Sequence, residues 1–275
     1  KSFIKKIYPF ASTFIYSVII SHGNLIILPL LHGALYAGIF QNAYIFITTL
    51  MFIPMSFGRV FIPYLYKHKN DDNTDRFQFA FEILSKCFVF ISFYITVILY
   101  LYSDFIITGV FGEKYSASIS TLKVITLSVP FLFNAGALML TALDKQRLYS
   151  NILRYAALIN VVLNIILGYY YLDKGTAAAM AVTFFMIFII SHLFIIFNSG
   201  LSVCSAAVYY LKGSAIFLLC WLVYHHIPFE YKIVSMAVIS LIYFVLSLLL
   251  LLTKDDIRIG KEILGRKNTQ DSMTS

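Results

Sequence analysis

Eight long apolar segments follow one another along this chain, and they restrict its fold more than any other feature. Each is roughly 20 to 28 residues long, which matches the ~20 residues that a helix needs to cross ~30 Å of hydrocarbon. None alternates polar and apolar residues with the period of two that a membrane β-barrel requires. The pattern therefore predicts an all-α polytopic membrane protein with about eight transmembrane helices. The segments are residues 7–30, 36–63, 78–102, 119–142, 150–171, 176–197, 208–227 and 233–253.

The composition supports the same class. Of the 275 residues, 60% are hydrophobic and 12% are charged, and the mean hydropathy is +0.83. Because a soluble domain carries about 25% charged residues, the composition excludes a soluble enzyme, a disordered chain and a nucleic-acid-binding module. The net charge of +8 needs another explanation than a nucleic-acid partner.

The positive charges alternate between loops. Fourteen Lys and Arg residues, Lys212 included, fall in the N-terminal segment, in every second loop and in the C-terminal tail. The other loops hold only Lys114, Lys174 and Lys232. Since cytoplasmic loops are enriched in Lys and Arg, we expect a multi-pass protein with both termini in the cytoplasm.

Charged and polar side chains inside the spans are the candidates for function, because a charge at the centre of a membrane helix costs about 2.5–3.5 kcal/mol. Arg59 lies ~6 Å from the cytoplasmic end of its span and Lys86 ~12 Å deep, at 1.5 Å per residue. Two interpretations stay open for both: a charge that faces a hydrated cavity, or a side chain that reaches the membrane surface or pairs internally, as Lys86 would with Glu82 one turn earlier. The substrate-cavity candidates are Arg59, Lys86, Asn24, Gln41 and Asn134.

No motif for catalysis, cofactor binding or metal binding is present in the sequence. The acidic cluster of Asp71, Asp72 and Asp75 lacks the ligand spacing of a calcium loop. The adjacent His225 and His226 would point to different sides of a helix, so they are poor chelators. We therefore expect neither a cofactor nor a metal site, and no enzymatic activity.

Three motifs, in order, resemble one transporter family. The pattern LYAGIFQNAY at 35–44, followed by a span that ends in VFIP at 60–63, resembles the eighth helix of polysaccharide flippases. FGEKY at 111–115, before a span that ends in TALDKQR at 141–147, is similar to the ninth-to-tenth helix region of that family. NVVLNIIL at 160–167 and GTAAAMA at 175–181 resemble its eleventh and twelfth helices. The family is that of the Wzx-type O-antigen and polysaccharide exporters, in the superfamily that includes the multidrug and toxin extrusion (MATE) transporters.

The resemblance implies a fold and a function. The family has two six-helix lobes around a central cavity and flips oligosaccharide repeat units on a polyprenyl diphosphate across the bacterial plasma (inner) membrane, for O-antigen or capsular polysaccharide biosynthesis. By this resemblance, residues 1–200 form the second lobe, 201–253 two additional transmembrane helices and 254–275 a cytoplasmic basic tail, while the first lobe is absent. The implied partners are the lipid-linked oligosaccharide, membrane lipids, and the missing N-terminal lobe or polysaccharide assembly proteins, with no nucleic acid.

Two alternative functions stay open. One is a membrane enzyme of the same pathway, such as a repeat-unit polymerase or an acyltransferase, although a polymerase is expected to have a large outer loop with arginines. The other is a drug or cation antiporter of the same superfamily, which requires intramembrane carboxylates. Glu82 is almost the only carboxylate within the predicted spans, and Asn24 stands where the family commonly has an acid.

Overall fold

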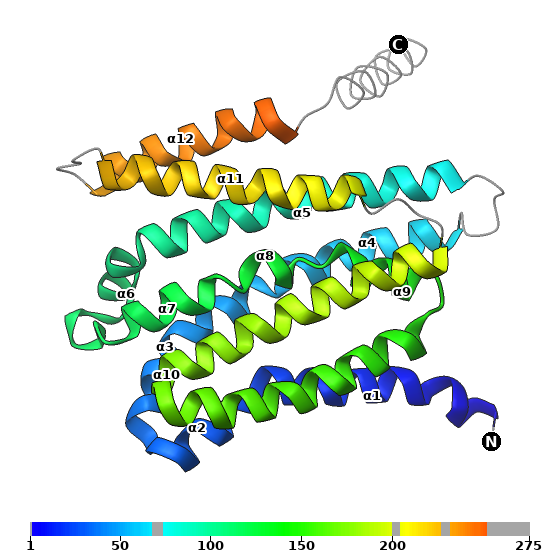
Figure 1. Ribbon diagram of the computed structural model, residues 1–275, viewed down its shortest axis with the longest axis horizontal. Coiled ribbons are helices and arrows are strands. Elements are labelled where there is room, and N and C mark those ends of the chain that lie inside the picture. Colours follow the sequence, from blue (N-terminus) through cyan, green and yellow to red (C-terminus); the bar gives the residue numbers. More distant parts are fainter. Residues whose placement is uncertain (1, 68–73, 200–203, 227–231, 252–275) are drawn as a thin grey trace, which may run out of the picture.

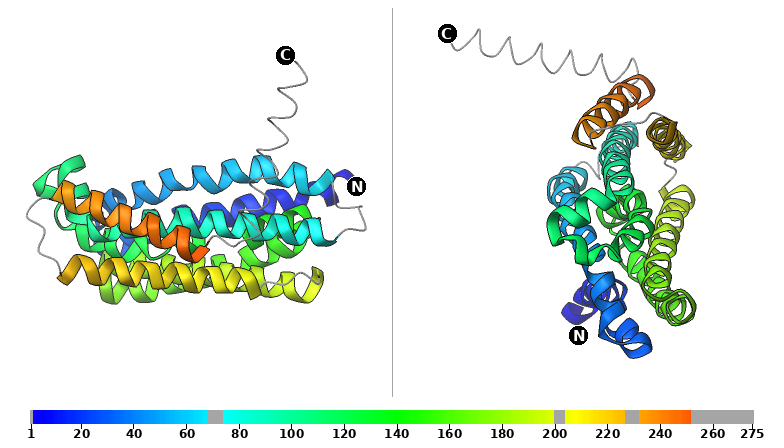
Figure 2. Two further views of the ribbon diagram at one scale, coloured as in Figure 1. Left: turned by 90° about the horizontal axis from the view of Figure 1, so that it is seen from above. Right: turned by 90° about the vertical axis from the view of Figure 1, so that its left-hand side faces the viewer.

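The computed structural model describes residues 2–67, 74–199, 204–226 and 232–251, and all regular structure within these ranges is helical. The helices form an elongated bundle with their long axes roughly aligned (Figure 1, Figure 2). Six stretches of the described chain are long and apolar enough to cross a membrane, and one bent pair of helices makes a seventh. The longest stretch, Gln146–Phe197, turns back on itself at Leu172 and so consists of two antiparallel arms. The predicted all-α polytopic class is confirmed.

The first two spans each consist of two consecutive helices. α1 (Ser2–His22) and α2 (Asn24–His32) form the first, and α3 (Ala34–Leu50) and α4 (Phe52–Lys67) form the second. Gly33 separates the spans with φ 81°, a conformation that glycine adopts without steric cost. The second span is nearly straight, because Met51 between its helices keeps a helical conformation.

The third span is straight and the fourth is broken. α5 (Thr74–Leu101) leads into α6 (Ser103–Phe111) and the short helix η1 (Glu113–Tyr115). The fourth span then continues through α7 (Ser118–Thr126), α8 (Val129–Leu132) and α9 (Ala135–Ala142), with a bend of 46° after α7. Pro130 lies in the first turn of α8, where its missing N–H is tolerated.

α10 (Gln146–Ser199) is a helical hairpin. Leu172 has φ 57° and ψ −136°, which breaks the helix between two antiparallel arms (Figure 1). A side chain at Gly175 would place its Cβ 1.8 Å from the carbonyl oxygen of Leu167, so glycine is required at this turn. Ala177 and Ala179 are fully buried, which agrees with the close packing expected of the small-residue run at 175–181.

The last two helices lie at the edge of the bundle opposite α1 and α2 (Figure 1, Figure 2). α11 (Cys204–His226) and α12 (Lys232–Leu251) both pack against α5. A Cβ at Gly213 would meet the Phe93 ring at 2.6 Å, so this glycine lets α11 approach α5 closely. The division at residues 200 and 253 stays a prediction, and the tail at 254–275 lies outside the described residues.

Candidate functional site

One face of the α3–α4 span is covered by no other part of the described chain. Phe40, Ala43, Tyr44 and Ile47 are fully or almost fully buried against the bundle. The opposite face is exposed along its whole length, at intervals of three or four residues, which is the spacing of a single helix face. Its exposed members are Gly38, Gln41, Ile45, Thr49, Phe52, Met55, Arg59 and Pro63, and we call it the α3–α4 face.

The hydroxyl groups along the α3–α4 face bond to their own helix. Thr48 and Thr49 both donate to the carbonyl oxygen of Ile45, at 2.9 and 2.8 Å, and Ser56 donates to Phe52 at 2.9 Å. Hydroxyls satisfied in this way tolerate an apolar environment. They are also available to a polar ligand, because a hydroxyl oxygen keeps acceptor capacity while it donates.

Arg59 and Gln41 differ from these hydroxyls. Both are exposed, and neither makes a hydrogen bond or ion pair with any described residue. They are eighteen residues, or five helical turns, apart, which places them on the same side of the span about 27 Å from each other. The α3–α4 face therefore carries polar groups over almost the full ~30 Å of a hydrocarbon core.

α9 supports this span from behind. A Cβ at Gly58 would lie 3.1 Å from the Leu138 side chain, so glycine allows α4 and α9 to pack closely one residue before Arg59. Close backbone packing through small residues is the usual way in which membrane helices associate. The position of Arg59 is thus set by a packed element and not by a loop.

Asn24 lies at the buried side of α2, facing α10. Its amide nitrogen contacts the sulfur of Met180 at 3.6 Å, and its Oδ1 has no hydrogen-bond partner. Deeper in the bundle, Asn160 donates to Thr183 at 2.9 Å and accepts from Asn164 at 3.0 Å. These interior groups are all uncharged, so they can form hydrogen bonds but supply no charge to a substrate.

Asn134 is a structural residue of the broken fourth span. It precedes α9, and its side-chain oxygen accepts from the N–H of Ala137 at 3.0 Å, as an N-cap residue does. The hydroxyl of Tyr210 donates to the adjacent Phe133 carbonyl at 2.6 Å. A Cβ at Gly136 would lie 3.0 Å from His192, so the break, α10 and α11 meet closely at this point.

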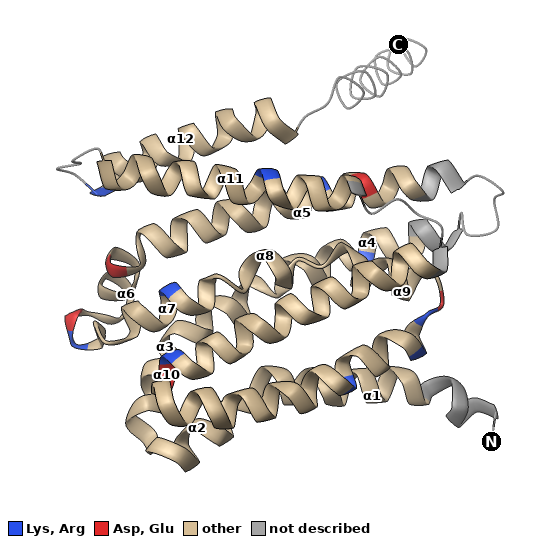
Figure 3. Cartoon of the chain, in the orientation of Figure 1, with Lys and Arg blue, Asp and Glu red and all other residues tan. Residues whose placement is uncertain are grey.

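Lys86 faces a different part of the bundle from Arg59. It is half-buried, and its ammonium nitrogen lies 5.1 Å from the centre of the Tyr209 ring on α11. Arg59 has no partner among the described residues, so Arg59 and Lys86 have no contact residue in common. Figure 3 shows blue positions on α4 and on the neighbouring α5 and α11. The structure therefore places Arg59 and Gln41 on one face and the other three candidates elsewhere.

Four functional-site candidates were missed or misplaced by sequence reasoning. Lys212 was expected in a loop, but it lies within the α11 span. His192 and Tyr210 are buried beside the break, and a histidine inside an apolar span was a readable signal for the first of them. Asp173 is buried and accepts a hydrogen bond from Thr121, and it was hidden because residues 172–175 resembled an exposed loop.

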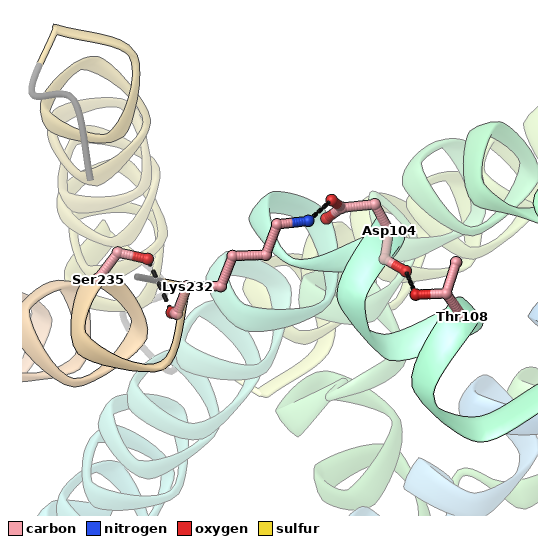
Figure 4. A network of polar contacts seen from close by, with 4 residues as sticks. All are labelled: Asp104, Thr108, Lys232 and Ser235. Carbon is pink, nitrogen blue, oxygen red and sulfur yellow. Dashed lines mark hydrogen bonds and ion pairs between the residues drawn. The ribbon is translucent and has the colours of Figure 1, made fainter. Parts of the chain in front are cut away.

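An ion pair joins α6 to α12 at the end of the bundle where α6 lies. Lys232 donates to the carboxylate of Asp104, and Thr108 and Ser235 bond to the backbone carbonyls of these two residues (Figure 4). Burial alone would raise the pKa of Asp104, but the hydrogen bond and charge of Lys232 and the N–H of Phe105 outweigh it and lower that pKa.

No group of three or more His, Cys, Asp or Glu side chains within the described ranges is arranged to hold a metal ion. Asp71 and Asp72 lie outside these ranges. The rings of His225 and His226 bond to the carbonyls of Trp221 and Leu222 on their own helix. The chemistry that the described site offers is hydrogen bonding and one exposed guanidinium.

Comparison with known proteins gives one informative likeness. No protein family model matches the sequence, and no curated protein matches it. Among solved structures, the chain is similar to the lipid II flippase MurJ in an inward closed conformation, with a TM-score of 0.65 and 19% sequence identity. The likeness covers 86% of this chain and 52% of the flippase. The chain thus has the same fold as part of that protein and spans about half of its length.

Proposed function

We propose that this chain is one half of a membrane translocator that moves an oligosaccharide, carried on a polyprenyl diphosphate, from one leaflet to the other. The observation that carries the proposal is the α3–α4 face, which no described element covers and on which Gln41 and Arg59 are exposed. The fold shared with half of a lipid II flippase supports the same function, since that protein is named for the movement of a lipid-linked precursor.

The physical problem that such a protein solves is the passage of a charged headgroup through hydrocarbon. An unpaired ionised group in a medium of low dielectric constant is strongly disfavoured. Arg59, near one end of the α3–α4 face, would bind the diphosphate through charge-assisted hydrogen bonds. Gln41 and the hydroxyls between them would contact sugar hydroxyls, while the polyprenyl tail stays in the bilayer.

The exposed α3–α4 face also supports the presence of a second half in the working transporter. A single helical lobe leaves this polar face open to lipid, where Arg59 is costly. Alternating access requires two lobes that move against each other around one site. We therefore place the other lobe, or an equivalent partner, against the α3–α4 face.

The substrate is an O-antigen or capsular repeat unit, in a bacterial plasma membrane with both chain ends in the cytoplasm. This narrower assignment rests on the order of the motifs at 35–44, 111–115, 141–147 and 160–181, and on the alternation of Lys and Arg between loops. A catalytic role is disfavoured, because the described α3–α4 face carries no carboxylate, thiol or imidazole.

Complementation tests both levels of the proposal. The 275-residue chain, alone or joined to an upstream lobe, is expressed in a strain without its polysaccharide flippase and in a strain depleted of its lipid II flippase. We expect the joined form to restore surface polysaccharide in the first strain and the single chain to fail in both. Rescue of the second strain only would shift the substrate to the other precursor class. Failure of the joined form in both strains, despite normal membrane abundance, would reject translocation.

A further inference from the structure

Two lysines of different helices share one aromatic ring inside the bundle. The ammonium nitrogen of Lys86 on α5 lies 5.1 Å from the centre of the Tyr209 ring, and that of Lys212 on α11 lies 5.9 Å from the same centre. Tyr209 is buried, with 7% of its surface exposed. A cation over an aromatic face is favourable, but two like charges held near one ring in a poorly solvated place repel each other.

Both lysines lie at the same depth and lean the same way. Lys86 is eight residues after the start of its apolar span at Gln78, and Lys212 is seven residues after the start of its span at Ser205. α5 and α11 begin at the same end of the bundle (Figure 1). Since a Cα–Cβ bond tilts toward the N-terminus of its helix, both stems lean toward that end, which is the side that the loop charges predict to be cytoplasmic.

Lys212 also contacts the end of α12. Its ammonium donates to the carbonyl oxygen of Leu250 at 2.8 Å, in the last described turn of that helix, where a cation is favoured. An ammonium group has three N–H donors, and this bond uses one. Lys212 is thus held between α11 and α12 and keeps two N–H donors for an anion.

The surface around Lys212 faces lipid. Val208, Leu211 and Leu249 are exposed by 41%, 69% and 73%, and such side chains on a membrane span contact acyl chains. This region lies at the edge of the bundle farthest from α1 and α2 (Figure 2). Basic sites between helices at the cytoplasmic side recognise lipid headgroups.

We propose that Lys86, Tyr209 and Lys212 form a binding site for the phosphate of an anionic glycerophospholipid in the leaflet where α5 and α11 begin. The phosphate oxygens accept hydrogen bonds from both ammonium groups and offset their mutual repulsion. The acyl chains lie along Leu211 and Leu249. The site is independent of translocation, since Arg59 and the α3–α4 face take no part in it.

The test compares lipid retention by charge-neutral variants. The full chain is placed in bilayer discs of phosphatidylglycerol and phosphatidylcholine with identical acyl chains, and the retained lipids are counted by native mass spectrometry. Lys86→Met and Lys212→Met keep an unbranched side chain of similar length without the charge. Because one lysine near a membrane surface contributes about 1 kcal/mol toward anionic lipid, we expect each change to weaken phosphatidylglycerol retention about five-fold and the double change about 25-fold.

Matched controls separate this site from general attraction. Lys123→Met and Lys174→Met remove two exposed lysines and are expected to leave retention unchanged, and Lys86→Arg with Lys212→Arg should preserve it. Equal retention of both lipids by the unaltered chain, or unchanged retention in the folded double Met variant, would overturn the proposal. Displacement of phosphatidylglycerol by polyprenyl diphosphate, lost only in the double Met variant, would reassign the site to the lipid carrier and equally overturn it. If the double Met variant fails to fold in phosphatidylcholine, the single variants decide by the same criterion.

Discussion

The side-chain amide of Asn160 donates to the hydroxyl of Thr183 at 2.9 Å, although 23 residues separate the two along α10. In a straight helix they would be about 35 Å apart. The contact exists because Leu172 reverses the chain. The hydroxyl of Thr183 in turn donates a hydrogen bond to the Ala179 carbonyl at 2.7 Å. A chain of hydrogen bonds thus links the two arms of α10 inside the bundle.

The Asn160–Thr183 bond should be measurable as a coupling energy. We expect a double-mutant cycle of Asn160→Ala and Thr183→Ala to give a favourable coupling of about 0.5–1.7 kcal/mol, the range found for hydrogen bonds between membrane helices. The measurement is reversible unfolding in mixed detergent micelles. Asn151→Ala is the matched control, because Asn151 is exposed on the same arm, and it should change stability by less than about 0.5 kcal/mol. Strict additivity of the two changes would contradict the bond.

Gly136 allows His192 to approach the break in the fourth span. An added Cβ would lie 3.0 Å from His192 Nδ1 and 3.1 Å from Asn134 Oδ1. We expect Gly136→Ala to destabilise the protein by about 1–3 kcal/mol, the usual cost of overpacking. Gly109→Ala on α6, where a Cβ meets nothing within 4 Å, should be neutral or slightly stabilising. A neutral Gly136→Ala would show that the break and α10 are farther apart.

The ion pair between α6 and α12 should depend on pH. Because Lys232 and the N–H of Phe105 keep the pKa of folded Asp104 below its usual value, ionised Asp104 stabilises the fold at neutral pH. That contribution is lost as pH falls from about 4 through the lowered folded pKa. Asp104→Asn should therefore lower the melting temperature at pH 7 and make no difference at strongly acidic pH. Both partners are partly exposed, so the effect should be small and shrink in high salt. An equal effect at both pH values would contradict this account.

The loop charges make a prediction about sidedness. Lys145 and Ser116 are exposed and lie at opposite ends of the fourth span. With Cys87, Cys204 and Cys220 replaced, we expect an impermeant thiol reagent on intact cells to label Ser116→Cys and not Lys145→Cys. Labelling of Lys145→Cys alone would invert the topology.

The spans were predictable because apolar length alone sets them, whereas the contacts between them were not. Arg59 and Lys86 were grouped as candidates because both are charged residues inside predicted spans. Position along a span does not show toward which neighbouring helix a side chain points. Lys86 lies against Tyr209 and Arg59 lies on an open face, and that difference depends on how α11 packs on α5. The eighteen-residue spacing of Gln41 and Arg59 is five full turns, so their shared side was readable from the sequence. The burial of Asp173 was not, because it depends on the reversed backbone at Leu172.

The movement of a lipid-linked saccharide past Arg59 tests the central claim most directly. The two-lobe protein is reconstituted in liposomes, and the rate at which a polyprenyl-diphosphate saccharide becomes accessible to an impermeant enzyme outside is measured. Since a hydrogen bond to a charged group contributes about 1.5–3 kcal/mol, we predict that Arg59→Ala lowers this rate about ten-fold or more, while Arg59→Lys retains part of it. Arg154→Ala, which removes an exposed arginine stacked on Tyr155, should leave the rate unchanged. An Arg59→Ala protein that moves the saccharide as fast as the unaltered protein would contradict the account.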